Sequence, residues 1–496
     1  MKKVKSIVSI VLCLIMITCM FTGCGKAEKN TADTSATTDT NATAEDTQAA
    51  ATEAPADTAS AEPVQLKLGI WPEDTLTEQI AQHEKFVSRY NETHPNVEVI
   101  PSYYKYSPDN FISMASAGTA PTIFETWYTE TQKLIDAGLV ADITENLKAR
   151  GWDTAMNPTI KELMSKDGKI YGIPRDGYGL GLYLNLELFE QAGLIDADGL
   201  PKYPKTWQEL AETSKIIKDK TGAAGFDLLA MDRNAGWHFS LIAWDFGAQL
   251  TTIDANGKYQ ANLDSPEAIE AMEFCRSLKW DYDVLTPDPL ADGWSEGHSN
   301  LGTGVCAMYL GANDSVAQPT ENFGLPVDKL ALVPAPAGPR GNQYVLSGGT
   351  PYMFAPNATN EEIEAALDYL VVMGKAPVAT EEAIAGWETD YQRQVSTGVP
   401  VIPRFPCWID QKVLDAESAV IEKYKNVDMR LFNDFYDLMK KDGALHLEEP
   451  VEVQAMYQEI CNVMQEVLTN KDADIPALMK QADENYQSII DTAKNQ

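Results

Sequence analysis

Apolar and polar positions alternate where the foldable part of the chain begins. Val64, Leu66 and Leu68 are separated by polar residues, and this two-residue period predicts a strand over 64–68. Apolar side chains then recur at helical spacing over 76–90, and the proline-terminated segment 91–95 stops the predicted helix. The chain therefore opens as a strand followed by an amphipathic helix.

Beyond this helix the pattern predicts a further strand, a helix and another strand. Short strands are predicted at 97–100 and 122–124, with a helical stretch near 111–117 between them. Strands that alternate with helices favour an α/β fold with a mostly parallel sheet, whose ligands bind at the carboxyl ends of the strands. His83 lies on the apolar stripe of the first helix and is interpreted as a core residue.

A different pattern precedes this region. Three lysines are followed by an apolar run over 7–21 and then by Thr22-Gly23-Cys24. The run is short for a membrane span and ends in small residues before a cysteine, which is typical of a lipoprotein signal peptide over 1–23 that leaves Cys24 N-terminal for lipidation. An uncleaved anchor helix is the alternative. In both cases the rest of the chain is expected on the outer face of the bacterial cell membrane.

Residues 24–63 consist mainly of Ala, Thr, Asp and Glu after the cysteine. Up to residue 63 this segment has no aromatic side chain and no Leu, Ile or Val, so it cannot bury enough apolar surface to offset the entropy of ordering. We interpret it as a disordered tether. The remaining stretch of 64–496 is longer than a single hydrophobic core usually supports, and two domains are expected.

Composition narrows the range of partners. The formal net charge is −34 at pH 7. Nucleic acid and anionic lipid are disfavoured as main partners, because both are bound through clustered Lys and Arg.

The cysteines of the body give no metal-site spacing and no dense disulfide framework. They lie far apart in the sequence, and buried thiols are the favoured interpretation, with one disulfide left open; they are Cys275, Cys306, Cys407 and Cys461. No metal and no cofactor are predicted.

Several segments carry a resemblance to a known family. In chain order they are 120–125 with 134–144, 171–174, 182–194, 204–210, 302–311, and 333–336 with 348–349. Taken together they resemble the extracellular solute-binding proteins, family 1, which serve ABC-type carbohydrate importers. Thr122 departs from the pattern, because the family commonly has Asp there.

The resemblance implies a two-lobed periplasmic-binding-protein-like fold of type II, with two α/β lobes joined by a hinge. It places the N-terminal lobe at 64–175 and 334–376, and the C-terminal lobe at 180–330 and 380–496. It further implies a monomer that binds a carbohydrate, an oligosaccharide by our interpretation, and delivers it to the permease subunits of an ABC transporter.

Candidate binding residues follow from the chemistry of sugars. A sugar offers weakly apolar C–H faces and a rim of hydroxyls, so its site needs aromatic platforms beside planar polar groups. Such combinations stand at predicted strand ends and loops: Trp71, Glu125, Trp127, Arg175, Asp176, Trp237, His238, Trp294, Asn313 and Asp314. Packing is the interpretation for Trp152, Trp207 and Trp280.

Two competing classes stay open. A secreted carbohydrate-active enzyme would use two carboxylates, but nothing in the sequence singles out a pair, and no hydrolase or nucleotide-binding motif is present. A two-lobed receptor could instead take a peptide, a polyamine or a metal complex. We therefore predict a binding protein rather than an enzyme.

Overall fold

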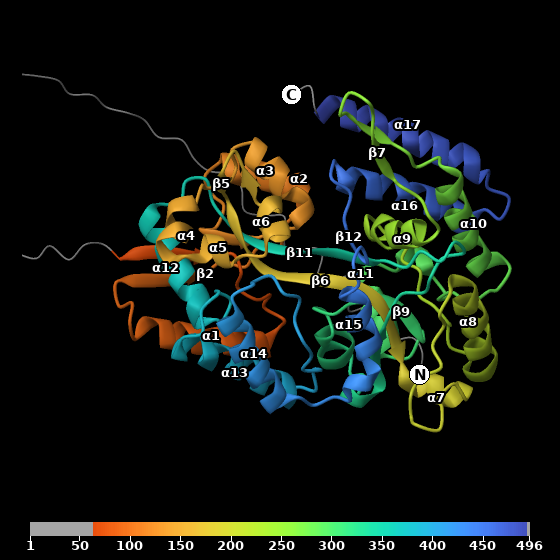
Figure 1. The fold of residues 1–496 in the computed structure, drawn as a ribbon, viewed down its shortest axis with the longest axis horizontal. Helices are drawn as coiled ribbons and strands as arrows, with labels where there is room; N and C mark the ends of the chain where they lie inside the picture. Colours follow the sequence, from red (N-terminus) through yellow and green to blue (C-terminus); the bar gives the residue numbers. More distant parts are fainter. Residues whose placement is uncertain (1–62, 494–496) are drawn as a thin grey trace, which may run out of the picture. The chain divides into compact units, whose positions relative to one another are not determined.

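The computed structural model describes residues 63–493 (Figure 1). The predicted signal peptide, the lipidation site at Cys24 and the tether up to residue 62 lie outside the described residues. Among the described residues, none of the helices combines the length and the apolar character needed to cross a bilayer.

The first elements follow the predicted order. They are β1 (Val64–Leu68), α1 (Thr77–Asn91), β2 (Val97–Pro101), α2 (Pro108–Ser116) and β3 (Ile123–Glu125). β1 pairs in parallel with both β2 and β3, so the carboxyl ends of all three strands meet at one edge of the sheet. The sequence prediction of these five elements is confirmed, with boundary differences of a few residues.

Short helices and a small hairpin cover the segment 128–170. They are α3 (Tyr128–Asp136), α4 (Thr144–Arg150), α5 (Trp152–Ala155), α6 (Pro158–Leu163), β4 (Ser165–Lys166) and β5 (Lys169–Ile170). α3 begins just after β3 and packs on β11, which places it next to the same sheet edge.

Two long strands connect the parts of the fold. β6 (Gly172–Asn185) pairs antiparallel with β11 (Val345–Phe354) through its first half and with β9 (Met308–Ala312) and β10 (Leu330–Val333) through its second half. The resulting order is β10-β6-β11-β3-β1-β2, and β12 (Leu445–Leu447) joins β11 in parallel. Figure 1 shows β6 and β11 running alongside each other through the middle of the fold.

The remaining elements lie mainly around the second half of β6. Between β6 and β11 they are α7 (Leu186–Ala192), α8 (Trp207–Thr221), α9 (Asn234–Asp245), β7 (Thr251–Ile253), β8 (Tyr259–Ala261), α10 (Pro266–Trp280), α11 (Trp294–Gly302) and a π-helical turn (Gln318–Asn322). After β11 they are α12 (Asn360–Val372), α13 (Glu381–Ser396), α14 (Gln411–Tyr424), α15 (Asn433–Met439), α16 (Val453–Thr469) and α17 (Ile475–Ala493). Three 3₁₀ turns complete the set, at Pro289–Ala291, Val327–Lys329 and Met429–Leu431.

Buried apolar side chains form two large clusters rather than one. The first joins β1, α1, β3 and α12 with the outer end of β11. The second joins the later half of β6 with α8, α9, α10, β9, α16 and α17. β6 contributes Ile173 to the first cluster and Leu180, Leu182 and Leu184 to the second, so this strand belongs to both cores.

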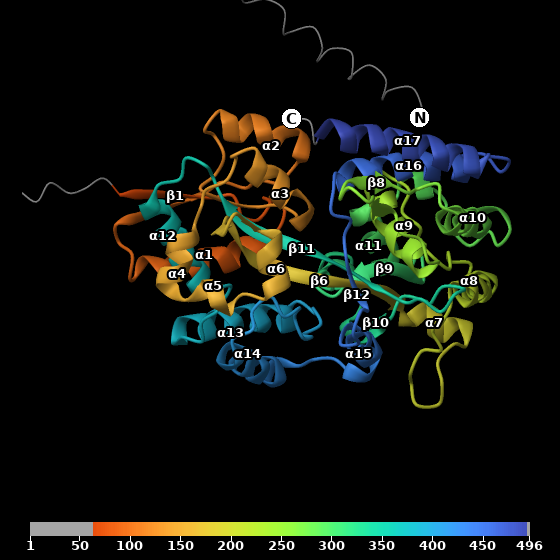
Figure 2. The same cartoon turned by 45° about the horizontal axis from the view of Figure 1, so that its top comes forward.

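α13 and α14 lie side by side (Figures 1 and 2) and bury a small cluster of their own around Trp387 and Tyr391. α13 also contacts α1 and α12. The lobe boundaries drawn from the sequence, at 175/180, 330/334 and 376/380, stay a prediction.

Packing roles assigned from the sequence agree with the structure. Trp152 and Trp207 are buried, and Trp280 is half-buried with its Nε1 donating to the Val467 carbonyl at 3.0 Å. The four cysteines of the body are free and buried, which confirms the thiol interpretation; they are Cys275, Cys306, Cys407 and Cys461.

Candidate ligand-binding cleft

A pocket of about 350 Å³ lies where the three parallel strands end. Residues that follow β1 and β2 line it together with the last residue of β3, and the loop after α12 and the helix α13 close another side. This is the edge at which α/β sheets usually hold ligands. We call it the strand-end pocket, and its aromatic and charged lining consists of Trp71, His83, Phe86, Tyr103, Tyr104, Tyr352, Glu73, Glu125, Arg175, Asp176, Lys375, Asp390 and Arg393.

The loop after β1 holds an aromatic side chain in the strand-end pocket. Gly69 permits the tight exit from the strand, because a Cβ there would lie 2.7 Å from the carbonyl oxygen of Ile123. Trp71 is half-buried, and its ring meets the His83 ring edge-on at a centroid distance of 5.3 Å. Burial, and then the charge of Lys375, lower the pKa of His83 to about 4, so this imidazole is neutral at pH 7.

Tyrosines occupy the equivalent position after β2. Tyr103 is 46% exposed and lies close enough to Glu73 to feel its charge. Desolvation, followed by the charge of Glu73, raises the pKa of Tyr103 above its ordinary value. An exposed ring beside a carboxylate offers both a flat apolar face and a hydroxyl-binding group.

Arg175 enters the pocket through an irregularity in the β6–β11 ladder. Thr350 pairs with Asp176 whereas Pro351 pairs with Pro174, so the register skips Arg175. A bulge is expected here, because proline has no N–H to donate to a ladder. A bulge changes the direction in which a side chain points, and here the side chain of Arg175 reaches Glu125 at the end of β3.

The guanidinium of Arg175 binds two carboxylates. Its Nη1 donates to Glu125 Oε2 at 2.7 Å and its Nε donates to Asp176 Oδ2 at 2.6 Å. Burial lowers the pKa of Arg175, but Asp176 and Glu125 outweigh burial and raise it. The other oxygen of Asp176, Oδ1, is buried and accepts no hydrogen bond from the described residues, which makes it an acceptor for a ligand hydroxyl.

A second charged group, Asp390, comes from α13. Asp390 accepts hydrogen bonds from Gln82 Nε2 at 3.1 Å and from Arg404 Nη2 at 2.9 Å. Burial raises the pKa of Asp390, but Arg404, Lys375 and Arg393 outweigh burial and lower the pKa below its ordinary value. Asp390 is therefore an ionised carboxylate whose charge is already balanced by basic groups of the protein.

Four of the predicted binding residues meet in the strand-end pocket, namely Trp71, Glu125, Arg175 and Asp176. The other six do not line it. Trp127 is half-buried and meets Tyr106 edge-on at 5.3 Å, and Trp237 packs in the same way against Tyr178 at 5.9 Å. A role of these two tryptophans in binding stays a prediction.

Three further candidates lie on the part of the chain between β6 and β11. His238 is fully buried, and desolvation, followed by His298, lowers its pKa to about 3. Trp294 is 37% exposed and lies over His298. Asn313 is buried, and its Oδ1 accepts from the Gly179 N–H at 2.8 Å, which ties the loop after β9 to β6.

Asp314, the next residue, is exposed and follows β9, which pairs with β6. Desolvation by the surrounding protein, and then the charge of Asp176, raise the pKa of Asp314 to about 7, although water reaches the side chain. A carboxyl group that is exposed to water and yet has a raised pKa fits a position in a cleft. Its contact with a ligand stays a prediction.

Sequence reasoning missed two sets of pocket residues. Tyr103 and Tyr104 follow β2 as Trp71 follows β1, so the same strand-end rule would have found them. The remaining pocket residues lie far along the chain and carry no local signal: Lys375 in the loop after α12, and Asp390 and Arg393 on α13.

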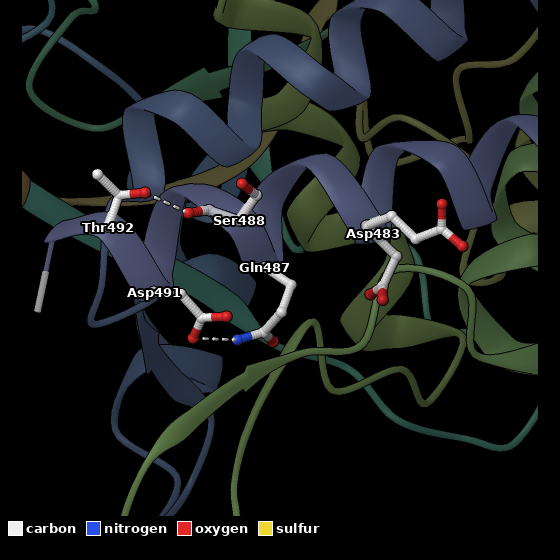
Figure 3. A pocket seen from close by; sticks show the side chains of 6 residues that line it. Asp483, Gln487, Ser488, Asp491 and Thr492 are labelled. Atoms are coloured by element: carbon white, nitrogen blue, oxygen red, sulfur yellow. Dashed lines mark hydrogen bonds between the residues drawn. The ribbon is translucent and has the colours of Figure 1, made fainter. Parts of the chain in front are cut away.

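A shallower hollow lies on one face of α17 (Figure 3). Its side chains are polar and come from this helix alone: Asp483, Glu484, Gln487, Ser488, Asp491 and Thr492. Two of them hold the neighbouring strand segment, since Asp483 Oδ1 accepts from the Leu263 N–H and Gln487 Oε1 from the Ala261 N–H. These contacts explain the hollow as a helix–strand junction.

Known proteins match this chain in sequence. A binding protein of Brucella abortus (strain 2308) is 26% identical over 236 residues, which are 46% of this chain and 52% of the relative. The arabinooligosaccharide-binding protein of Halalkalibacterium halodurans is 25% identical over 232 residues, 44% of this chain and 47% of the relative. The chain thus spans about half the length of the curated relatives it matches.

Solved structures share the architecture. Maltose-bound MalE3 of T. maritima superposes with a TM-score of 0.62 at 18% identity, covering 83% of this chain and 96% of that chain. This likeness shows the fold, which is the two-lobed type II periplasmic-binding-protein-like fold expected from the sequence.

The family follows from a wider match. The model for the bacterial extracellular solute-binding proteins matches residues 73–377, which is more than half of the chain. The match includes β2 and β3, the whole of β6 and β11, and the residues of the strand-end pocket from Glu73 to Lys375. The chain therefore belongs to the family of bacterial extracellular solute-binding proteins.

Proposed function

We propose that this protein is a receptor that captures a carbohydrate, an oligosaccharide, outside the cell and delivers it to an ABC importer. The observation that carries the proposal is the strand-end pocket, in which Trp71 and Tyr103 stand beside Glu125 and Asp176. Aromatic faces can stack on the C–H surface of a sugar while carboxylate oxygens accept its hydroxyls.

Relatives support this choice of ligand. The arabinooligosaccharide-binding protein is named for its sugar, and a further match is a lactose-binding protein. The matched family is described by binding rather than by a reaction, which favours a receptor over a glycosidase. Within the pocket, Glu125 and Asp176 both accept from Arg175, an arrangement that suits holding hydroxyls better than donating a proton to a leaving group.

We also propose that the body is attached to the membrane through a lipid on Cys24 and acts as a monomer next to the permease subunits. The support is the sequence of the N-terminal region, where a lysine-rich start and an apolar run precede Cys24. An extracellular location agrees with the family description.

A thermal-shift screen over monosaccharides, oligosaccharides, peptides and polyamines tests the proposal. A ligand present at about 100 times its dissociation constant should stabilise the folded state by about 2.7 kcal/mol. We expect oligosaccharides to give the largest shifts. A shift with peptides or polyamines and none with any carbohydrate would contradict the carbohydrate assignment.

A further inference from the structure

We infer that the carbohydrate bound in the strand-end pocket carries an anionic group, a carboxylate or a phosphate, and that Lys375 recognises it. The inference rests on the proposed function and adds a ligand class and a specificity-determining residue to it. Its basis is that the arginines around the pocket form ion pairs with carboxylates of the protein, whereas Lys375 does not.

Every arginine around the strand-end pocket already has carboxylate partners. Arg175 binds Glu125 and Asp176. Arg393 donates to both carboxylate oxygens of Glu321 at 2.7 Å. These charges are therefore largely neutralised before a ligand enters.

Arg404 does not line the pocket but contacts Asp390, which does, and it is neutralised in the same way. Its Nη2 is 2.9 Å from Asp390 Oδ2 and its Nε is 3.4 Å from Glu417 Oε1. Asp390 accepts from Arg404 and Gln82 together, and it also lies 3.7 Å from Arg393. Its oxygens are thus occupied by groups other than Lys375.

Lys375 is the pocket cation without such a partner. Among residues 63–493, no carboxylate oxygen lies within 4.0 Å of its Nζ. The ammonium of Lys375 is half-buried and lines the strand-end pocket, so its three donors are available to a bound molecule.

The main chain holds Lys375 in a fixed position. Gly374 adopts a φ of 70°, and its carbonyl accepts a hydrogen bond from Trp387 Nε1 at 2.6 Å. The Lys375 N–H donates to the Leu370 carbonyl at 2.8 Å, which closes the end of α12. With the main chain fixed, only the side-chain torsions of Lys375 remain to be ordered when a ligand binds.

The charged groups around Lys375 act on its pKa in both directions. Desolvation, followed by Arg404, lowers the pKa of Lys375, and Arg175 acts in the same direction, whereas Asp390 and Asp176 raise it. The effects of the two arginines and of the two aspartates on this pKa therefore have opposite signs. A partly buried ammonium in this setting gains most from a ligand that brings its own negative charge, because a neutral hydroxyl cannot balance it.

Calorimetric titration with matched probes tests the inference. The neutral probes are galactotriose and glucose, and the anionic probes are trigalacturonate and glucose 6-phosphate, which separate the carboxylate from the phosphate. We expect at least one anionic probe to bind at least tenfold more tightly than its neutral counterpart. Neutral probes that bind as tightly as the anionic ones, or binding of neutral probes alone, would overturn the inference and leave the proposed function intact.

Three variants assign the effect to Lys375. Lys375→Met should weaken the anionic probe at least tenfold and leave a neutral sugar unchanged, whereas Lys375→Arg should retain most of the affinity. Lys85→Met, which removes an exposed charge of α1 outside the pocket, is the matched control. Equal affinity of Lys375→Met and the wild type for the anionic probe would refute the role of Lys375. Failure of every sugar, neutral or anionic, would instead refute the proposed function.

Discussion

Arg175 reaches the ligand pocket because the ladder between β6 and β11 skips it. Its two carboxylate partners come from different strands, Glu125 from β3 and Asp176 from β6 itself. Arg175 therefore links β6, which belongs to both cores, to the sheet edge where the parallel strands end. Charge-assisted contacts of this kind hold their partners more firmly than neutral hydrogen bonds do.

The aromatic platform of the pocket makes the first prediction. Trp71→Ala should weaken carbohydrate binding by about 1 to 3 kcal/mol, as loss of a desolvated aromatic contact typically does, with little change in the melting temperature of the free protein. Trp207→Ala is the contrast, since Trp207 is buried and its Nε1 donates to Asp245 at 3.1 Å. Its loss should lower the free energy of unfolding by about 3 to 5 kcal/mol.

Calorimetric titration and thermal unfolding of both variants provide the check. If Trp71→Ala destabilised the free protein and kept full affinity, Trp71 would be a packing residue and our pocket assignment would be wrong.

A buried pair of carboxyl groups in the second core makes a pH-dependent prediction. Asn300 Nδ2 donates to Asp227 at 2.8 Å and to Asp292 at 3.1 Å, and Thr286 donates to Asp292. Burial, and then the charge of Asp292, raise the pKa of Asp227 to about 8. Asp227 is therefore mostly protonated in the folded protein near neutral pH.

Because the pKa of Asp227 is raised on folding, the folded state binds its proton more tightly than the unfolded state does. The contribution of Asp227 to the free energy of unfolding is then most favourable below its unfolded pKa of 3.8 and declines as pH rises towards about 8. Asp227→Asn cannot ionise, so the wild type should lose stability relative to this variant between pH 5 and pH 8.

Denaturant unfolding at several pH values measures the difference. Asp328→Asn, at an exposed aspartate, serves as the control. A gap between the wild type and Asp227→Asn that stays constant from pH 5 to pH 8 would argue against a protonated Asp227.

At the scale of elements, α12 carries the chain from β11 to the loop of Lys375. Its N-terminus is fixed by a capping box, in which the Glu362 N–H donates to Thr359 Oγ1 at 3.2 Å and the Thr359 N–H donates to Glu362 Oε2 at 2.8 Å. Helix starts of this type satisfy main-chain donors that the helix itself cannot pair.

The cap gives a stability prediction for α12. Thr359→Ala should lower the free energy of unfolding by about 1 kcal/mol, because it removes the acceptor for the Glu362 N–H. Thr359→Ser keeps the hydroxyl and should retain most of the stability. Urea unfolding of the two variants decides the point, and an equal loss in both would exclude the cap as the cause.

Elements were easier to predict from the sequence than the pocket they form. The two-residue period of 64–68 and the helical spacing of 76–90 are local signals, and both elements were predicted correctly. The register between β6 and β11 depends on residues far apart in the chain, so the bulge at Arg175 left no local trace. Trp127 and Trp237 illustrate the same limit, because an aromatic residue near a strand end or loop does not reveal which pocket it lines.

At the scale of the whole molecule, the two cores share the strands β6 and β11, and the ligand pocket lies beside these strands. Such an arrangement suits a receptor that closes around a solute by hinge motion. An extracellular location agrees with the family, and the net charge of −34 disfavours nucleic acid as a main partner.

Attachment to the membrane makes the last variant prediction. Cys24→Ala should remove the lipid anchor and release the protein from the membrane fraction, and its affinity for the carbohydrate should not change, because the tether is separate from the ligand pocket in the sequence. Membrane fractionation followed by immunoblotting compares the two proteins. Equal retention of the variant and the wild type would contradict the lipoprotein assignment.

The central claim is that the protein binds a carbohydrate without transforming it. Its most direct test is a tryptophan-fluorescence titration with the oligosaccharide that gives the largest thermal shift, followed by chromatography of the same samples. We predict a saturable fluorescence change, reduced in Trp71→Ala, with the oligosaccharide recovered intact. Release of shorter sugars by the wild-type protein, or no saturable change with any carbohydrate, would contradict the account.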